Sequence, residues 1–163
     1  MIEAIRTAVL FGATLTTGLV AGLFFAFTCA VMPGLAATDD RTLVGTMQSI
    51  NRKILNGWFL SAFLGALPLL AAAVATHFTR GGPVLLWTVA ALACHLVTFG
   101  VTVGLNVPLN NRLEAAGPVD RIADLGEVRA WFEATWVRGN LVRTISSVAA
   151  FACLIAALLT RHG

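Results

Sequence analysis

Four long stretches of this chain contain no charged side chain, and they leave few choices of fold. The stretches cover residues 7–38, 54–79, 81–111 and 144–160. Each is close to or longer than the roughly 17–25 residues that an α-helix needs to cross about 30 Å of hydrocarbon. Together they use most of the 163 residues. The pattern therefore predicts an all-α integral membrane protein, a four-helix transmembrane bundle that forms one domain over residues 1–163.

We expect the membrane spans at about 7–32, 55–77, 84–106 and 141–160. The first stretch exceeds the apolar region of a signal peptide, about 7–15 residues, so we expect it to remain as a span. Charged residues make up 12% of the chain, against about 25% in soluble domains. The chain has ten arginines and one lysine, which favours a GC-rich genome over a nucleic-acid partner. We therefore expect a multi-pass protein of a bacterial plasma membrane.

Both longer connectors between spans carry apolar residues at helical spacing. These residues are Leu43, Met47, Ile50 and Ile54 in the first connector, and Ile122, Leu125, Val128 and Phe132 in the second. The pattern predicts two interfacial helices that lie along the membrane surface.

Small residues recur four apart in every span, as Gly18 and Gly22 do in the first. Such stripes allow close helix packing in lipid. They serve either the bundle itself or a contact in a homo-oligomer. Trp58, Trp87 and Trp136 fall at predicted span ends, where interfacial tryptophans are expected.

Four spans place both termini on one side of the membrane, here named side A, and both longer connectors on the other, side B. Side A carries three of the eleven basic residues, Arg6, Arg80 and Arg161. The positive-inside rule would then place side B in the cytoplasm. Side B also carries seven of the eight acidic residues, so the orientation stays open.

Asparagine is confined to side B, at or beside the ends of spans two, three and four. The six are Asn51, Asn56, Asn106, Asn110, Asn111 and Asn140. Asn106 and Asn110 share a face if the turn between them is helical. A buried amide is costly in lipid unless it faces the bundle or a wet cavity. We therefore predict one polar pocket open to side B; the alternative is that these residues only cap helices and close loops.

Arg143 lies in the first turn of the last predicted span. Its guanidinium cannot lose its charge in a protein, so it needs an anion, carbonyl groups or water at that depth. Two interpretations remain open. The side chain either holds an anion in the pocket or extends to the lipid headgroups.

The remaining chemically active side chains predict no metal or redox centre. His95 is the one ionisable residue near the middle of a span, and a neutral imidazole bonded to a neighbouring Ser or Thr explains it as well as a functional role. No His, Asp or Glu pair within a span has metal-ligand spacing. Cys29, Cys94 and Cys153 occur singly, as small buried hydrophobic residues do.

The polar residues fall within segments that resemble a known family. These segments are Phe24-Phe25-Ala26-Phe27 with Val31-Met32-Pro33-Gly34-Leu35; Met47-Gln48-Ser49-Ile50-Asn51-Arg52; Asn106-Val107-Pro108-Leu109-Asn110; and Trp136 with Asn140, Val142, Arg143 and Thr144. Together they resemble the anthrone oxygenase-like family of small four-helix membrane proteins, most of whose members have no known function. The family often has a histidine where this chain has Leu141.

The resemblance implies that the protein oxidises an anthrone to a quinone with dioxygen, without metal or flavin. Its partners would be the bilayer, a lipophilic aromatic molecule and dioxygen. Stabilisation of the oxyanion would fall to Arg143, Asn110 and Asn106. Substrate contacts would come from the amides of Asn51, Asn56 and Asn140 and from apolar walls made by Trp136, Phe59 and the aromatic run around Phe25. The base would be a substrate phenolate or a loop carboxylate such as Glu133.

Two alternatives belong to other functional classes. The protein could bind or transport a small amphiphile without changing it, although the sequence shows no inverted repeat of the kind common in transporters. It could also be an accessory subunit of a membrane complex.

Overall fold

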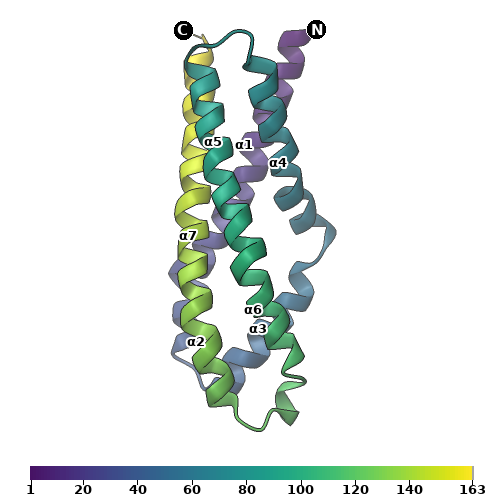
Figure 1. Cartoon of the computed structure of the whole chain (residues 1–163), viewed down its shortest axis with the longest axis vertical. Helices are drawn as coiled ribbons and strands as arrows, with labels where there is room; N and C mark the ends of the chain where they lie inside the picture. Colours follow the sequence, from purple (N-terminus) through teal and green to yellow (C-terminus); the bar gives the residue numbers. More distant parts are fainter. Residues whose placement is uncertain (163) are drawn as a thin grey trace.

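The computed structural model describes residues 1–162, and within that range it contains helices and no strands. Four helical rods of this range are long and apolar enough to cross a membrane: Ile2–Ala36, Gly57–His77, Gly82–Ala115 and Leu125–Leu159. They run side by side along the long axis, and both termini lie at one end, side A (Figure 1). The all-α membrane bundle predicted from the charge-free stretches is confirmed.

Two of the rods are interrupted by a π-helical turn, and a separate helix joins the first two rods. The elements in chain order are α1 (Ile2–Ala26), η1 (Phe27–Val31), α2 (Met32–Ala36), α3 (Asp40–Ile54), α4 (Gly57–His77), α5 (Gly82–Val101), η2 (Thr102–Asn106), α6 (Val107–Ala115), η3 (Val119–Arg121), α7 (Leu125–Leu159) and η4 (Thr160–His162).

Short polar residues and glycines set the ends of these helices. Asp39 caps α3, because its carboxylate accepts the backbone N–H of Thr42 at 2.8 Å and the Thr42 hydroxyl at 3.0 Å. The same bonds lower the pKa of the Asp39 carboxyl. Between α4 and α5, Gly81 and Gly82 adopt φ of 65° and 76°, which favours glycine and permits the tight turn.

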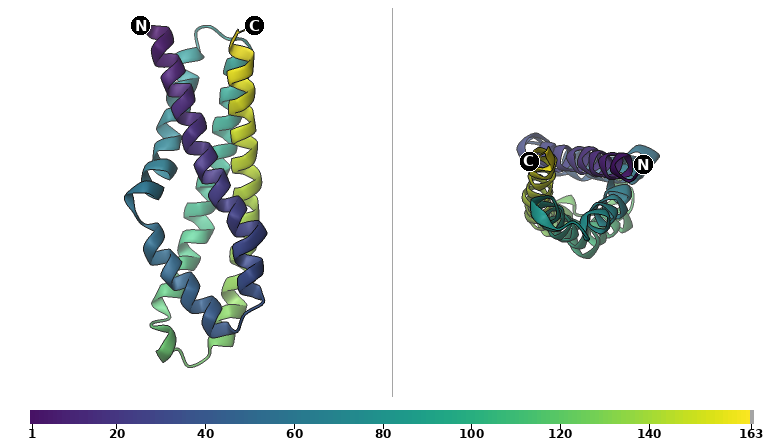
Figure 2. Two further views of the ribbon diagram at one scale, coloured as in Figure 1. Left: turned by 180° about the vertical axis from the view of Figure 1, so that it is seen from behind. Right: turned by 90° about the horizontal axis from the view of Figure 1, so that it is seen from above.

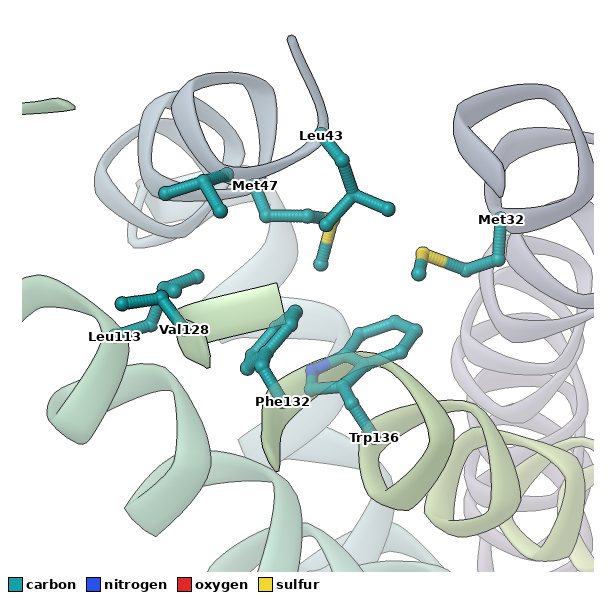
Figure 3. Close-up of a cluster of buried hydrophobic side chains, with 8 residues drawn as sticks. Met32, Leu43, Met47, Leu113, Val128, Phe132 and Trp136 are labelled. Atoms are coloured by element: carbon teal, nitrogen blue, oxygen red, sulfur yellow. The ribbon is translucent and has the colours of Figure 1, made fainter. Parts of the chain in front are cut away.

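The rods form a ring in which α1 contacts α4 and α7, and α5 contacts α7 and α4; Figure 2 shows it from above. One apolar cluster, which includes Leu10, Leu70 and Leu154, fills the side-A half. Another fills the side-B end and brings α2, α3, α6 and α7 together (Figure 3). Its members are Met32, Leu43, Val44, Met47, Leu113, Val128, Phe132 and Trp136. This second cluster fixes the connector α3 against the bundle.

The two connectors differ from each other. The first forms the separate helix α3, and its Leu43 and Met47 are fully buried. The second was expected to form its own interfacial helix, but its residues from Leu125 onward are the first turns of α7. No proline interrupts the chain between Leu125 and Leu159, so the amphipathic turns and the apolar span propagate as one helix. The last rod therefore begins at Leu125 rather than near residue 141.

Both π-helical turns lie against one segment of α7. In η1 the Thr28 hydroxyl is 2.8 Å from the Thr144 hydroxyl. In η2 the Asn106 side-chain amide donates to the Trp136 carbonyl at 3.1 Å. Gly139 makes the second contact possible, because a Cβ at this position would lie 2.6 Å from Asn106 Oδ1 and 2.8 Å from Leu105 Cδ2. The rods α5–η2–α6 and α7 thus approach each other more closely than a larger residue would allow.

We predict that Gly139→Ala destabilises the protein by about 1–3 kcal/mol, because overpacking at a close contact forces side chains and backbone to shift. The measurement is the unfolding temperature in detergent, followed by circular dichroism. Gly100→Ala is the matched control, since a Cβ at Gly100 meets nothing within 4 Å, and alanine in a helix is more stable than glycine. Equal unfolding temperatures for the two variants would contradict the close contact.

Candidate functional site

A cavity of about 250 Å³ opens near the junction of α3 and α4, between this junction, α1, α6 and α7. The junction bows outward from the bundle in both side views (Figures 1 and 2). This cavity, here named the side-B pocket, is lined by Leu23, Phe24, Phe27, Ile50, Asn51, Arg52, Ile54, Leu55, Phe59, Thr102, Val107, Asn110, Asn111, Glu114, Trp136, Asn140 and Arg143. A mostly apolar wall with a few polar groups is typical of small-molecule sites.

Arg143 is buried in the pocket wall, with 5% of its surface exposed. Its guanidinium carbon lies 4.3 Å from the centre of the Phe24 ring and 5.2 Å from the centre of the Trp136 ring, within the range of cation–π attraction. None of the ion pairs found in residues 1–162 includes it. The side chain therefore faces the pocket and does not extend to the lipid headgroups.

Asn140 fixes the position of Arg143 and links α7 to the first rod. Its Oδ1 accepts a hydrogen bond of 2.8 Å from the Arg143 guanidinium. Its Nδ2 donates to the Phe24 carbonyl at 3.1 Å and to the Thr28 hydroxyl at 2.8 Å. Every polar atom of the Asn140 side chain is thus bonded, and a single amide connects α1, η1 and the buried cation.

Trp136 is held from two directions by the asparagines around Pro108. Its indole N–H donates to Asn110 Oδ1 at 2.8 Å, while its carbonyl accepts from Asn106. The ring is 4% exposed and packs on Phe27 and Phe132. Trp136 is therefore not the interfacial tryptophan expected from its place at a span end. It forms part of the pocket wall, whereas Trp58 is 91% exposed.

Two buried hydrogen-bond donors on the pocket wall have no partner within the described part of the chain. They are Arg143 Nε on α7 and Asn51 Nδ2 on α3. A buried donor without a partner is costly, so native structures rarely leave one unbonded. Both residues line the cavity, so a cation and an amide are available there to an oxygen atom of a ligand. The charge of Arg143 favours an anionic oxygen.

The predicted site residues separate into two groups. Arg143, Asn110, Asn51, Asn140, Trp136 and Phe59 all line the side-B pocket. Asn106 is fully buried behind Trp136 and does not line it. Asn56 is exposed and caps α4, because its side-chain oxygen accepts the Phe59 N–H at 3.1 Å. For this residue the structure shows the helix-capping alternative rather than a place in the pocket. Phe25 is 54% exposed on the outside of α1, and its neighbours Phe24 and Phe27 line the pocket instead.

Three polar residues of the wall were absent from the sequence-based prediction. Arg52 and Glu114 form a salt bridge of 2.8 Å from α3 to α6 beside the pocket, and Thr102 lies in η2. Glu114 follows Asn110 by four residues, so helical spacing alone places both on one face of α6. Arg52 adjoins Asn51 in the sequence, but nothing local distinguishes it from an exposed basic residue.

The other residues considered lie elsewhere. Glu133 is not on the pocket wall; it bonds Arg129 at 2.7 Å in a separate hollow that also includes Asp40. His95 is fully buried against Phe63, and neither ring nitrogen has a partner in residues 1–162. The hydrogen bond expected from a neighbouring Ser or Thr is thus not found. Within the same residues, no group of three or more His, Cys, Asp or Glu side chains is placed to hold a metal ion.

A comparison with protein families matches residues 55–153 to the model described as anthrone oxygenase. The matched region runs from the start of α4 into α7 and includes Asn106, Asn110, Trp136, Asn140 and Arg143. Neither the curated proteins nor the solved structures gave a match.

We predict that Arg143→Met leaves the unfolding temperature in detergent unchanged or raises it. A buried charge without an ionic partner costs several kcal/mol of desolvation, and methionine removes that cost while filling similar space. This gain offsets the loss of the hydrogen bond to Asn140 Oδ1. Asn140→Ala should lower the free energy of unfolding by about 1–3 kcal/mol, because it leaves buried partners unbonded. Arg138→Met, at an exposed position of the same helix, is the control. A large loss of stability in Arg143→Met would make Arg143 a structural residue.

Proposed function

Since this chain belongs to the anthrone oxygenase family, we propose that it is a membrane enzyme that oxidises a lipophilic polycyclic aromatic, such as an anthrone, to a quinone with dioxygen. The observation that carries this proposal is Arg143, a buried cation without an ionic partner among the described residues, on the wall of a mostly apolar cavity that Asn51 also lines. We further propose that it acts in a bacterial plasma membrane, where an apolar substrate is concentrated.

The pocket suits the charge that this chemistry creates. An anthrone has a carbonyl group on the ring opposite a methylene carbon, and removal of one methylene proton gives an anion whose charge is shared with the carbonyl oxygen. Donors aimed at the developing oxyanion stabilise it most in a site that excludes water. Arg143 and Asn51 would bind this oxygen, while Phe24, Phe27, Phe59 and Trp136 would pack against the rings.

The remaining steps need only the ring anion and dioxygen. The anion transfers one electron to dioxygen, and the resulting ring radical and superoxide combine to form a carbon–oxygen bond. Protonation gives a hydroperoxide. Loss of the second methylene proton then breaks the O–O bond and releases water. One oxygen atom of dioxygen ends in the quinone and the other in water, so the substrate loses four electrons and dioxygen gains four.

The departure from the family pattern at Leu141 lies outside the pocket. Leu141 is 45% exposed on the outer face of α7 and does not line the cavity. A leucine at this position therefore leaves the wall of the pocket unchanged.

The first test is dioxygen uptake by the purified protein in lipid nanodiscs with a hydroxylated anthrone, with quinone formation followed by absorbance. We predict that Arg143→Ala lowers turnover by about a hundredfold or more, as removal of one oxyanion donor does in other enzymes. Arg138→Ala, which removes an exposed arginine five residues away, should keep full turnover. Tight binding of the anthrone without any uptake would favour the binding or transport alternative.

The two asparagines on either side of the α3–α4 junction provide a second test. Asn51→Ala should lower turnover by about a hundredfold, because it removes the other free donor. Asn56→Ala should lower the unfolding temperature through loss of the α4 cap, worth about 1 kcal/mol, and leave turnover of the folded protein unchanged. Equal losses of turnover in both variants would contradict the assignment of Asn51 as a ligand-binding donor.

A further inference from the structure

The proposed reaction begins with loss of a proton from carbon, and the pocket wall offers one side chain to accept it. Among the lining residues that the structure describes, Glu114 is the only carboxylate, and none is His, Lys or Cys. An arginine side chain is a cation and a poor base in proteins, and amides are too weakly basic to act. The sequence has no tyrosine. Glu114 is therefore the one described lining side chain that can act as a protein base.

Glu114 and the two proposed oxyanion donors come from different helices around the pocket. Glu114 lies on α6, one turn after Asn110, whereas the two unpartnered donors come from α3 and α7. Asn110 itself is bonded to the Trp136 indole, which fixes this face of α6 relative to the aromatic wall. In the binding mode that we propose, a flat ring system directs its oxygen to Arg143 and Asn51, and another ring carbon faces α6.

The surroundings of Glu114 suit repeated proton transfer. Its carboxylate accepts from Arg52 at 2.8 and 3.2 Å, so its position is fixed from α3. Its side chain is 46% exposed, so a proton taken from the substrate can pass on to water. Glu133, the carboxylate suggested by the sequence, bonds Arg129 and lies outside the pocket.

We infer that Glu114 is the general base that removes the methylene proton, an assignment that rests on the proposed oxygenase function. The substrate C–H bond breaks and an O–H bond forms at the Glu114 carboxylate. The electron pair stays on the ring and its charge is shared with the oxygen beside Arg143. No oxidant takes part in this step; dioxygen reacts afterwards with the anion.

The test compares Glu114→Gln with Glu133→Gln in nanodiscs, by quinone formation and, separately, by binding of the quinone product through quenching of tryptophan fluorescence. General acid–base groups contribute about 10²–10⁴-fold to rates, so Glu114→Gln should lower kcat by at least about a hundredfold. Its affinity for the quinone and its unfolding temperature should match those of the wild type. Glu133→Gln should keep the wild-type kcat.

Two further readouts separate a base from a structural residue. Raising the pH should increase kcat of Glu114→Gln steeply, because hydroxide replaces the missing base, whereas the wild type should change less. A substrate deuterated at the methylene carbon should slow the variant more than the wild type, because C–H cleavage then limits the rate.

The other outcomes count against the inference in distinguishable ways. An active wild type together with an equally active Glu114→Gln variant would overturn the role of Glu114 alone. Loss of quinone binding along with turnover would make Glu114 a binding residue. A wild type that binds the anthrone and consumes no dioxygen would overturn the proposed function and this inference with it.

Discussion

The arrangement of the side-B half depends on one buried amide. Asn140 bonds the Phe24 carbonyl, the Thr28 hydroxyl and the Arg143 guanidinium, so it joins α7 to the first rod and orients the buried cation. In a setting where unbonded polar groups cost several kcal/mol, these bonds specify one relative position of the two helices. Apolar packing alone tolerates many positions, because lipid tails and leucine side chains offer similar contacts.

A π-helical turn lies in each of the two rods that bond to this part of α7 through Thr28 and Asn106. In each one a backbone N–H bonds five residues back, Met32 to Phe27 in η1 and Val107 to Thr102 in η2. A wide turn shifts the side chains that follow it around the helix. Thr28 in η1 and Asn106 in η2 both bond to α7. Such turns occur frequently at functional sites, and here both border residues of the pocket wall.

The sequence predicts features that depend on local composition and misses those that depend on contact between rods. Charge-free length is a local property, and it predicts the four spans. The helical spacing of Leu43 and Met47 is local too, and it predicts the helix between the first two spans. The sequence groups six asparagines on side B, but Asn51 and Asn56 have the same local character. Only the tertiary structure separates a residue of the pocket wall from a helix cap. Nothing in the local composition predicts the π-helical turns. Gly139 is likewise one of many small residues in the sequence, and only the structure shows how closely Asn106 approaches it.

Arg143 has no acidic partner among the described residues. This has a thermodynamic consequence for a molecule bound in the pocket. A site that binds an anion more tightly than its neutral parent must, by linkage, make the bound molecule a stronger acid by the same factor. A hundredfold preference corresponds to about 2.7 kcal/mol, or two units on the acidity scale. An aromatic guest with a weakly acidic C–H group would thus ionise in the pocket at a pH where it stays neutral in the surrounding lipid.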